Sequence, residues 1–221
     1  MAQHEEAAMM AAAGLSCDRL HWALRRLHSL SGIVPIGFFL FFHLFENAYV
    51  TRGGAAWWKE TEFTRSMPFQ VAIEATMLWI PIFYHAVYGF VITSTAQPNV
   101  TDYQLSRNYQ YTLQRITGII AFMFIGYHVL STRGWFYLTG VETNFARMHA
   151  TMLNPALLAI YLVGTLSCVY HLTNGIFTFC ITWGISAGPR AQNMVNYACI
   201  ALFIVLAIVS VDILISFRAG V

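Results

Sequence analysis

Two short stretches of the sequence repeat a histidine in the same setting. FYHAVYG at residues 83–89 and VYHLTNG at residues 169–175 each place a tyrosine before the histidine and a glycine four residues after it. The two histidines, His85 and His171, are 86 residues apart. An imidazole can bind a metal, form hydrogen bonds or carry a proton. The repetition therefore points to one of these three kinds of chemistry.

Two further histidines, His43 and His128, also lie in strongly apolar stretches. An imidazole in the hydrocarbon of a membrane is costly, so such histidines normally face the interior of a helix bundle and have a partner there. For one histidine alone, a hydrogen bond to a neighbouring helix is a sufficient explanation. Four histidines, one in each of four apolar stretches, suggest a common role.

The composition identifies the elements that must position these histidines. Hydrophobic residues make up 57% of the chain and charged residues only 10%, which is too little polar surface for a soluble domain. Because a bilayer core needs about 20 apolar residues per helix, the sequence predicts an all-α integral membrane bundle of five helices joined by short loops. The predicted spans cover residues 27–50, 69–96, 111–132, 153–183 and 194–217. Residues 1–21 are expected to be a surface segment that precedes a membrane domain of residues 22–221.

The first two predicted helices resemble the next two. LHSLSGI at residues 27–33 matches LQRITGI at residues 113–119, again 86 residues later. Since each copy contains two helices, related helices run in the same direction, and the symmetry axis stands along the membrane normal. The fifth helix has no counterpart.

The rise of a helix predicts two layers of histidines. Counted from the ends of their helices, His43 and His128 lie about 8–13 Å from the side of the membrane that faces away from the N-terminus. His85 and His171 lie about 24–26 Å from that side, so the two layers are about 15 Å apart. Each layer holds two histidines from different helices. Two stacked haems, each bound by two histidines, are the most economical explanation.

A zinc or copper site and a proton relay each account for fewer of these observations. Zinc or copper would need ligands that converge at one depth, and proton relays generally use carboxylates. Gly89 and Gly175 follow His85 and His171 by one helical turn, and their missing side chains would admit a flat macrocycle or simply allow close helix packing. The four cysteines form neither CxxC nor CxxCH, which excludes an iron–sulfur motif and covalently attached haem.

The first helix contains one residue more than its counterpart. From Gly32 to His43 is 11 residues, whereas from Gly118 to His128 is 10, and Pro35 lies in the longer interval. An additional residue at constant depth predicts a wide turn or π-bulge near Pro35, because proline removes a backbone donor.

These residues resemble a known family. The stretches RRLHSLSGIVPIGFFLFFHLFENA, FYHAVYG, QRITGIIAFMFIGYH and VYHLTNGIFTFCITWGI resemble the dihaem cytochrome b anchor of bacterial succinate dehydrogenases and fumarate reductases, which consists of one subunit with five helices. The likeness covers nearly all of residues 22–217. It implies that His85 and His171 bind the proximal haem b, and that His43 and His128 bind the distal one.

The resemblance also implies partners and location. It places the chain in the bacterial cytoplasmic membrane with a cytoplasmic N-terminus, which the equal Lys and Arg counts on the two sides do not decide. A flavoprotein and an iron–sulfur protein would dock on the cytoplasmic face and carry the dicarboxylate site. This chain would then pass electrons to a membrane quinone, expected to be menaquinone. Lipid and quinone are its other expected contacts, and no nucleic-acid partner is expected.

Several polar residues near the helix ends are candidates for quinone or haem contacts. Glu46 follows His43 by one turn, and quinone chemistry needs a group that takes up and releases protons. A solvated helix cap is the alternative for Glu46. At the other end, donors and cations could hold haem propionates or a quinone headgroup, or could form only a hydrated rim. These residues are Arg25, His28, Ser31 and Arg115.

Two other functions are compatible with the same pattern. One is a transporter or proton channel in which the histidines form a transmembrane relay. The other is a dihaem anchor of a different quinone-linked oxidoreductase. Low-spin b-type spectra would distinguish the first from a haem protein, and co-purification with a succinate-oxidising flavoprotein would distinguish the second.

Overall fold

The structure, a computed structural model, describes residues 18–220. Within that range the chain is helical and has no strand, and five helices are long and apolar enough to cross a membrane. The prediction of an all-α membrane bundle with five spans is therefore confirmed. Most of the predicted surface segment, residues 1–17, lies outside the described residues. Residues 18–21 already belong to the first helix, so the helical domain begins before residue 22.

The five spans are built from the following elements. The first span, Asp18–Arg52, contains η1 (Gly32–Gly37), α2 (Phe38–Ala48) and η2 (Tyr49–Arg52). The second contains α4 (Gln70–Glu74), η3 (Ala75–Trp79) and α5 (Ile80–Ser94), and the third contains α6 (Ser106–Val129), η4 (Leu130–Gly134) and α7 (Trp135–Thr139). The fourth is α9 (Pro155–Thr182) and the fifth is α10 (Pro189–Ala219).

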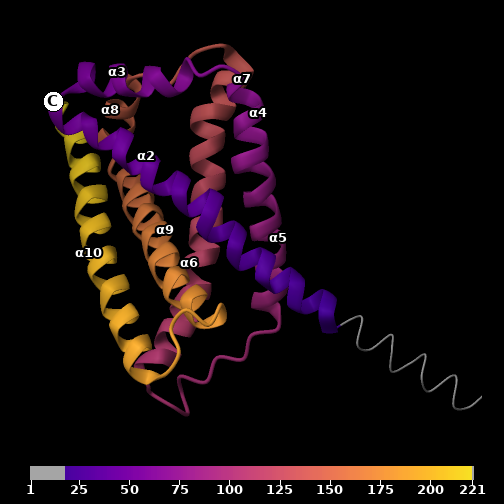
Figure 1. Cartoon of the computed structure of the whole chain (residues 1–221). Helices are drawn as coiled ribbons and strands as arrows, with labels where there is room; N and C mark the ends of the chain where they lie inside the picture. The colour runs from indigo at the N-terminus through magenta and orange to yellow at the C-terminus, as the bar shows by residue number, and fades with distance from the viewer. Residues whose placement is uncertain (1–17, 221) are drawn as a thin grey trace, which may run out of the picture.

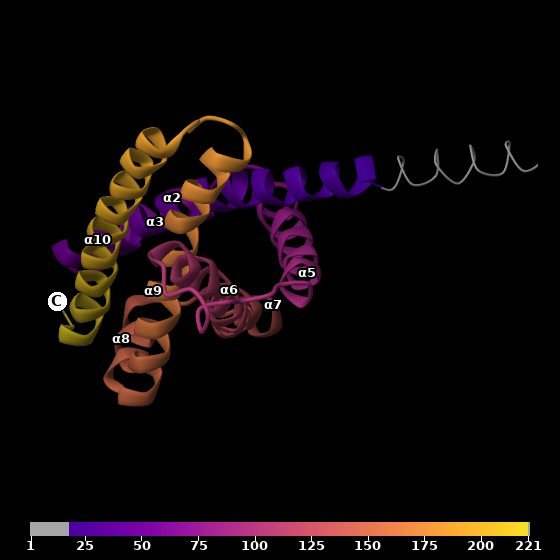
Figure 2. The ribbon, with the colours of Figure 1, turned by 90° about the horizontal axis from the view of Figure 1, so that it is seen from below.

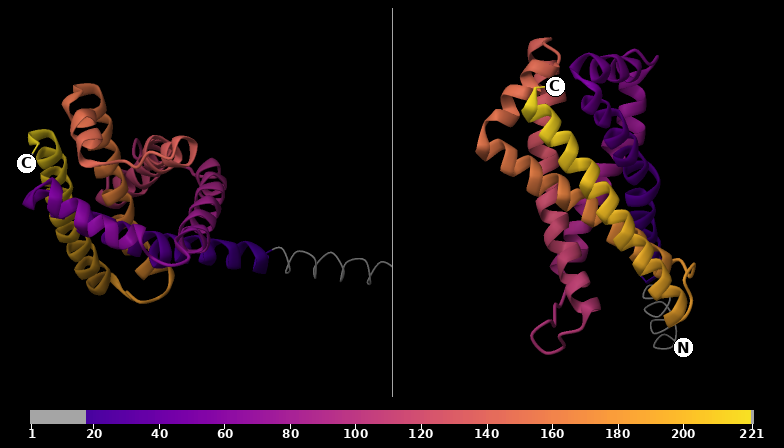
Figure 3. Two further views of the ribbon diagram at one scale, coloured as in Figure 1. Left: turned by 90° about the horizontal axis from the view of Figure 1, so that it is seen from above. Right: turned by 90° about the vertical axis from the view of Figure 1, so that its left-hand side faces the viewer.

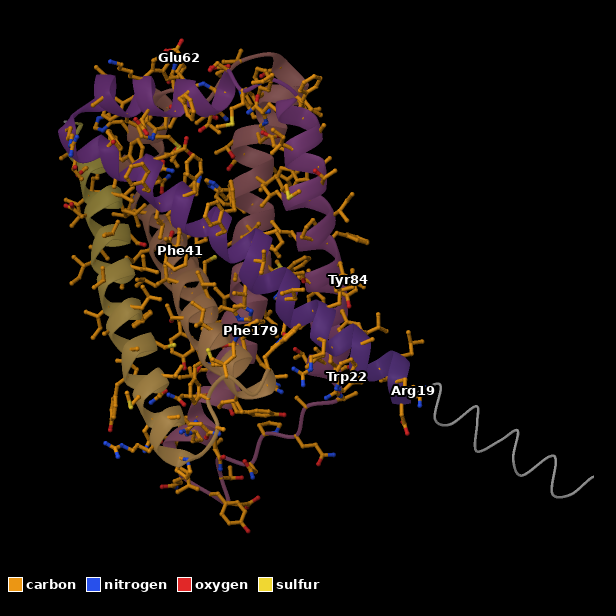
Figure 4. All side chains as sticks on the ribbon, in the orientation of Figure 1. Arg19, Trp22, Phe41, Glu62, Tyr84 and Phe179 are labelled. Carbon is orange, nitrogen blue, oxygen red and sulfur yellow. The ribbon has the colours of Figure 1, made fainter. Side chains whose placement is uncertain are left out.

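Two connections are longer than the short loops that the sequence suggested. α3 (Gly54–Arg65) joins the first and second spans, and α8 (Phe145–Leu153) joins the third and fourth. Both lie at the same end of the bundle, and the side chain of Glu62 marks the outer edge of α3 (Figures 1 and 4). With 12 and 9 residues, these two helices are too short to cross a membrane, and they cover this end of the bundle.

Local signals explain where the fourth span begins. Pro155 occupies the first turn of α9, where its missing N–H costs no hydrogen bond. The side chain of Asn154 caps the helix by accepting hydrogen bonds from the backbone N–H groups of Ala156 and Leu157, at 2.9 and 3.2 Å. The start of this span is thus determined by its own sequence.

The first four spans form a ring. Contacts join the first span to the second, the second to the third, the third to the fourth and the fourth back to the first. α10 lies outside this ring and packs against α9, α8 and α2 (Figure 2). The C-terminal end of α10 and the first described residues lie at opposite ends of the molecule, as five spans require (Figure 3).

The predicted irregularity near Pro35 is confirmed. Residues Gly32–Gly37 form a π-helical segment with Pro35 inside it. Proline has no N–H to give to the preceding turn, so the wider turn accommodates the additional residue. Two further π-helical segments, η3 and η4, were not predicted. η3 directly precedes the turn that contains Pro81, which gives it the same physical cause.

Candidate functional site

The four intramembrane histidines meet in two pairs inside the ring. The ring centroids of His85 and His171 are 6.1 Å apart with their planes at 90°. Those of His43 and His128 are 5.8 Å apart with their planes at 68°. Each pair joins two spans that are diagonal in the ring, the second with the fourth and the first with the third. These are the same pairs that the depth estimate grouped into layers.

The spacing of each pair suits one metal ion between two imidazoles. Imidazole nitrogens bind transition metals at about 2 Å, which puts the centres of two rings on opposite sides of an ion about 6 Å apart. A structural zinc site needs four protein ligands and a catalytic one three, and residues 18–220 contain no cluster of three or more such side chains. Two opposed imidazoles with the remaining positions supplied by a macrocycle match the ligand set of a b-type haem.

Backbone carbonyls hold the first pair in the tautomer that binds a metal. Nδ1 of His85 donates to the carbonyl oxygen of His28 at 2.9 Å, and Nδ1 of His171 donates to that of Gln114 at 3.0 Å. With the proton on Nδ1, Nε2 is the unprotonated nitrogen and is free to act as a ligand. The two acceptors are 86 residues apart, as are the two donors, so the sequence repeat is also a repeat of contacts.

Side chains support the second pair instead. Nδ1 of His128 is 3.3 Å from the hydroxyl oxygen of Tyr161, which is only 3% exposed. Asn47 lies beside the His43 ring, with its Nδ2 3.5 Å from both ring nitrogens, and accepts a hydrogen bond from Trp57. Tyr161 was not among the residues predicted from the sequence. The second repeat has this tyrosine at the position where the first repeat has Ala75, and that difference between the repeats could have indicated its role.

Gly89 and Gly175 face side chains of the neighbouring helices. A Cβ atom at Gly89 would lie 3.3 Å from Cε1 of His28, and one at Gly175 would lie 3.6 Å from Nε2 of Gln114. His28 and Gln114 occupy equivalent positions in the two repeats. These contacts favour helix packing over a macrocycle cradle as the role of both glycines.

Two of the four polar residues predicted for the proximal end lie beside the first pair. The His28 ring stacks on His85 with centroids 4.0 Å apart and planes within 10°. Ser31 is 8% exposed, and its Oγ lies 3.5 Å from Nδ1 of His85. Nδ1 of His28 is buried and has no hydrogen-bond partner among the described residues. This unsatisfied atom is available to a bound group.

The other two predicted residues, Arg25 and Arg115, do not lie beside the first pair. Arg25 is exposed at the surface of the first helix. The guanidinium of Arg115 lies 3.3 Å from the ring centre of Tyr111 and donates to the Tyr111 carbonyl oxygen at 2.7 Å. Neither arginine is brought into contact with the paired histidines.

A polar cavity of about 200 Å³ opens one helical turn beyond the second pair. Glu46, three residues after His43, and Thr132, four residues after His128, both line it. Glu46 is only 6% exposed and accepts a hydrogen bond from the hydroxyl of Thr64. This burial favours a role inside the cavity over a solvated helix cap for Glu46. The complete lining is Glu46, Thr61, Thr64, Arg65, Gln70, Glu74, Thr132, Arg133, Phe136, Glu142 and Thr143.

The three carboxylates of this cavity differ in their partners. Glu74 forms an ion pair with Arg133 at 2.9 Å and accepts a hydrogen bond from its Nε at 3.2 Å, and Glu142 pairs with Arg65 at 3.3 Å. Within residues 18–220 Glu46 forms no ion pair. An ion pair favours the charged carboxylate, so the unpaired Glu46 is the carboxyl of this cavity best suited to take up and release a proton.

A membrane bundle that holds opposed histidine pairs across its interior belongs to the class of membrane-embedded b-type cytochromes. Residues 96–210 match the family described as "Succinate dehydrogenase/Fumarate reductase transmembrane subunit". The chain is also 40% identical over 193 residues to the "Succinate dehydrogenase cytochrome b558 subunit" of Bacillus subtilis (strain 168), which covers 87% of this chain and 95% of the relative. The chain belongs to the succinate dehydrogenase/fumarate reductase transmembrane subunit family. This membership confirms the resemblance and favours a cytochrome b subunit over a transporter relay.

Proposed function

We propose that this chain is the dihaem cytochrome b anchor of a succinate:quinone oxidoreductase. In this proposal His85 and His171 hold a proximal haem b, and His43 and His128 hold a distal one. The supporting observation is the pair of diagonal histidine contacts, each with the ring spacing of a bis-imidazole metal site. A haem with two imidazole ligands supplies reversible one-electron transfer.

The spacing of the two sites supports electron transfer between them. Gly118 contacts the ring of His171 and lies 10 residues before His128 on the same helix. At the rise of an α-helix this interval separates the two histidine pairs by about 15 Å along the bundle. His28 and Ser31 lie at the proximal pair, where their polar atoms would receive haem propionates.

The cavity that Glu46 and Thr132 line is the proposed site of the quinone headgroup. It adjoins the distal pair, and Glu46 would exchange the protons that accompany electron transfer to a quinone, expected to be menaquinone. The hydroxyl of Thr143 also lines this cavity and is buried without a hydrogen-bond partner among the described residues. A quinone carbonyl is an acceptor that this hydroxyl would satisfy.

The partners in this proposal are a flavoprotein and an iron–sulfur subunit. They would dock at the end of the bundle that carries residue 18, on the cytoplasmic face of a bacterial inner membrane, and the dicarboxylate site would belong to them. The B. subtilis relative supports this assembly because it is named as a subunit of succinate dehydrogenase.

Spectroscopy of the purified complex tests this proposal. We expect two b-type haems per chain, low-spin spectra, a co-purifying flavoprotein, and reduction of at least the proximal haem by succinate. A haem-free complex would contradict the haem assignment. A dihaem complex that succinate does not reduce would point to another quinone-linked oxidoreductase.

The π-helical segment near Pro35 gives a second test. Deleting Pro35 makes the interval from Gly32 to His43 as long as that from Gly118 to His128, so a regular helix would keep both histidine pairs aligned. We expect both haems to remain. Deleting Ile120 from the regular helix α6 should rotate His128 by about 100° relative to Gly118 and eliminate one haem. Haem content per chain measures both results, and loss of a haem on deletion of Pro35 alone would contradict this account of the bulge.

A further inference from the structure

The rings of the proximal pair each rest against a glycine of the neighbouring helix. A Cβ atom at Gly32 would lie 2.9 Å from Nδ1 of His85, and one at Gly118 would lie 2.9 Å from Cε1 of His171. A Cβ atom cannot lie so close to a ring atom, so the ring or the helix would have to move. Gly32 and Gly118 are 86 residues apart and therefore occupy the same place in the two repeats.

The same helix faces also supply the hydrogen-bond acceptors for these rings. The carbonyl oxygen that receives Nδ1–H belongs to His28 for the first ring and to Gln114 for the second. Each of these residues lies four positions before the glycine, one helical turn away on the same face. Each proximal imidazole is thus held at two points by one neighbouring helix, a carbonyl that binds Nδ1 and a glycine that contacts the ring.

We propose that Gly32 and Gly118 are positioning residues for the two proximal axial histidines. This inference depends on the proposed haem function. A methyl group at either position would displace the imidazole ring, while the hydrogen bond from Nδ1–H would hold one edge of the ring in place. Nε2 would therefore turn away from the partner histidine. The perpendicular arrangement of the two ring planes depends on the same contacts.

The distal pair is positioned differently, which makes the expected effect selective. Gly126, two residues before His128, would place its Cβ atom in open space, with no heavy atom within 4 Å. The rings of the distal pair are supported by Asn47 and Tyr161 instead. Substitution of Gly32 or Gly118 should therefore alter the proximal haem and leave the distal haem unchanged.

The test compares Gly32→Ala and Gly118→Ala with wild type in the complete membrane complex. We expect the proximal haem to be lost, or its midpoint potential and the largest g value of its low-spin EPR signal to shift, because that g value depends on the angle between the axial ring planes. The distal signal should not change. A variant chain that accumulates in the membrane without the proximal haem supports the proposal equally.

Two control variants separate ring positioning from general packing. Gly54→Ala creates an equally close contact, 2.7 Å from Cγ of Phe145, which is not a residue of the proximal pair. Gly175→Ala lies one turn after His171 but meets only Gln114 at 3.6 Å. Both controls should retain wild-type spectra for both haems.

Two results would overturn the positioning role. One is a Gly118→Ala complex whose proximal signals match those of wild type, and the other is a Gly175→Ala complex that is altered as much as Gly118→Ala. In either case a wild-type complex with two haems would leave the proposed function standing. A wild-type complex without haem would reject the proposed function itself.

Discussion

Replacing His171 with leucine is expected to remove the proximal haem from the complex. The leucine side chain cannot bind iron, so only His85 would remain as a protein ligand on the opposite side of the site. Haem content per chain should fall from two to one, and the low-spin signal of the proximal site should disappear. His85→Leu should have the same result. Because the proximal site faces the soluble subunits in this proposal, both variants should also weaken their docking, measured as flavin recovered with the membrane subunit.

The distal histidines and one unrelated histidine complete this experiment. His43→Leu and His128→Leu should remove the distal haem and leave the proximal one. His149 is a suitable control because its Nδ1 donates to the carbonyl oxygen of Phe217 at 2.7 Å, away from both pairs. His149→Leu should retain both haems. If one of the four ligand variants kept both haems with unchanged low-spin spectra, that histidine would not be an axial ligand.

Replacing Glu46 with glutamine is expected to separate quinone reduction from the other activities of the complex. Glutamine retains the shape of the side chain and an oxygen that accepts the hydrogen bond from Thr64, but it cannot carry a proton at this position. Loss of a positioned proton donor or acceptor lowers rates by about 10²–10⁴-fold in typical enzymes. Quinone-linked succinate oxidation should fall by about tenfold or more, since water in a polar cavity can replace part of this function. Both haems and succinate oxidation with a soluble dye should remain.

A second carboxylate in the same cavity provides the control. Glu142 is 42% exposed and pairs with Arg65 at the cavity edge, an arrangement that typically contributes about 0–1 kcal/mol. Glu142→Gln should therefore have little effect on quinone-linked activity. Unchanged activity in Glu46→Gln would exclude Glu46 as the proton-handling group. A quinone analogue bound beside His28 and Ser31 would place the reaction at the opposite end of the bundle, in the rim that also includes Arg25.

Features that depend on distance along one helix followed from the sequence alone. Five apolar stretches defined the spans, the 86-residue repeat defined two related helix pairs, and residue counts grouped His43 with His128 and His85 with His171. A helix has a fixed rise per residue, so depth in the membrane can be counted without knowing what packs beside it. The same counting predicted the π-helical segment near Pro35.

Features that depend on neighbouring segments required the tertiary structure. The burial of Glu46 against Thr64, the bond from His128 to Tyr161 and the contact of Gly118 with His171 each join residues of different helices. α3 and α8 cover one end of the bundle only because the spans bring them together. Counting along a helix gives height, but which side chains meet across the bundle depends on how the helices pack and rotate against one another. Packing therefore decided which polar residues join the histidine pairs and which, like Arg25, remain outside.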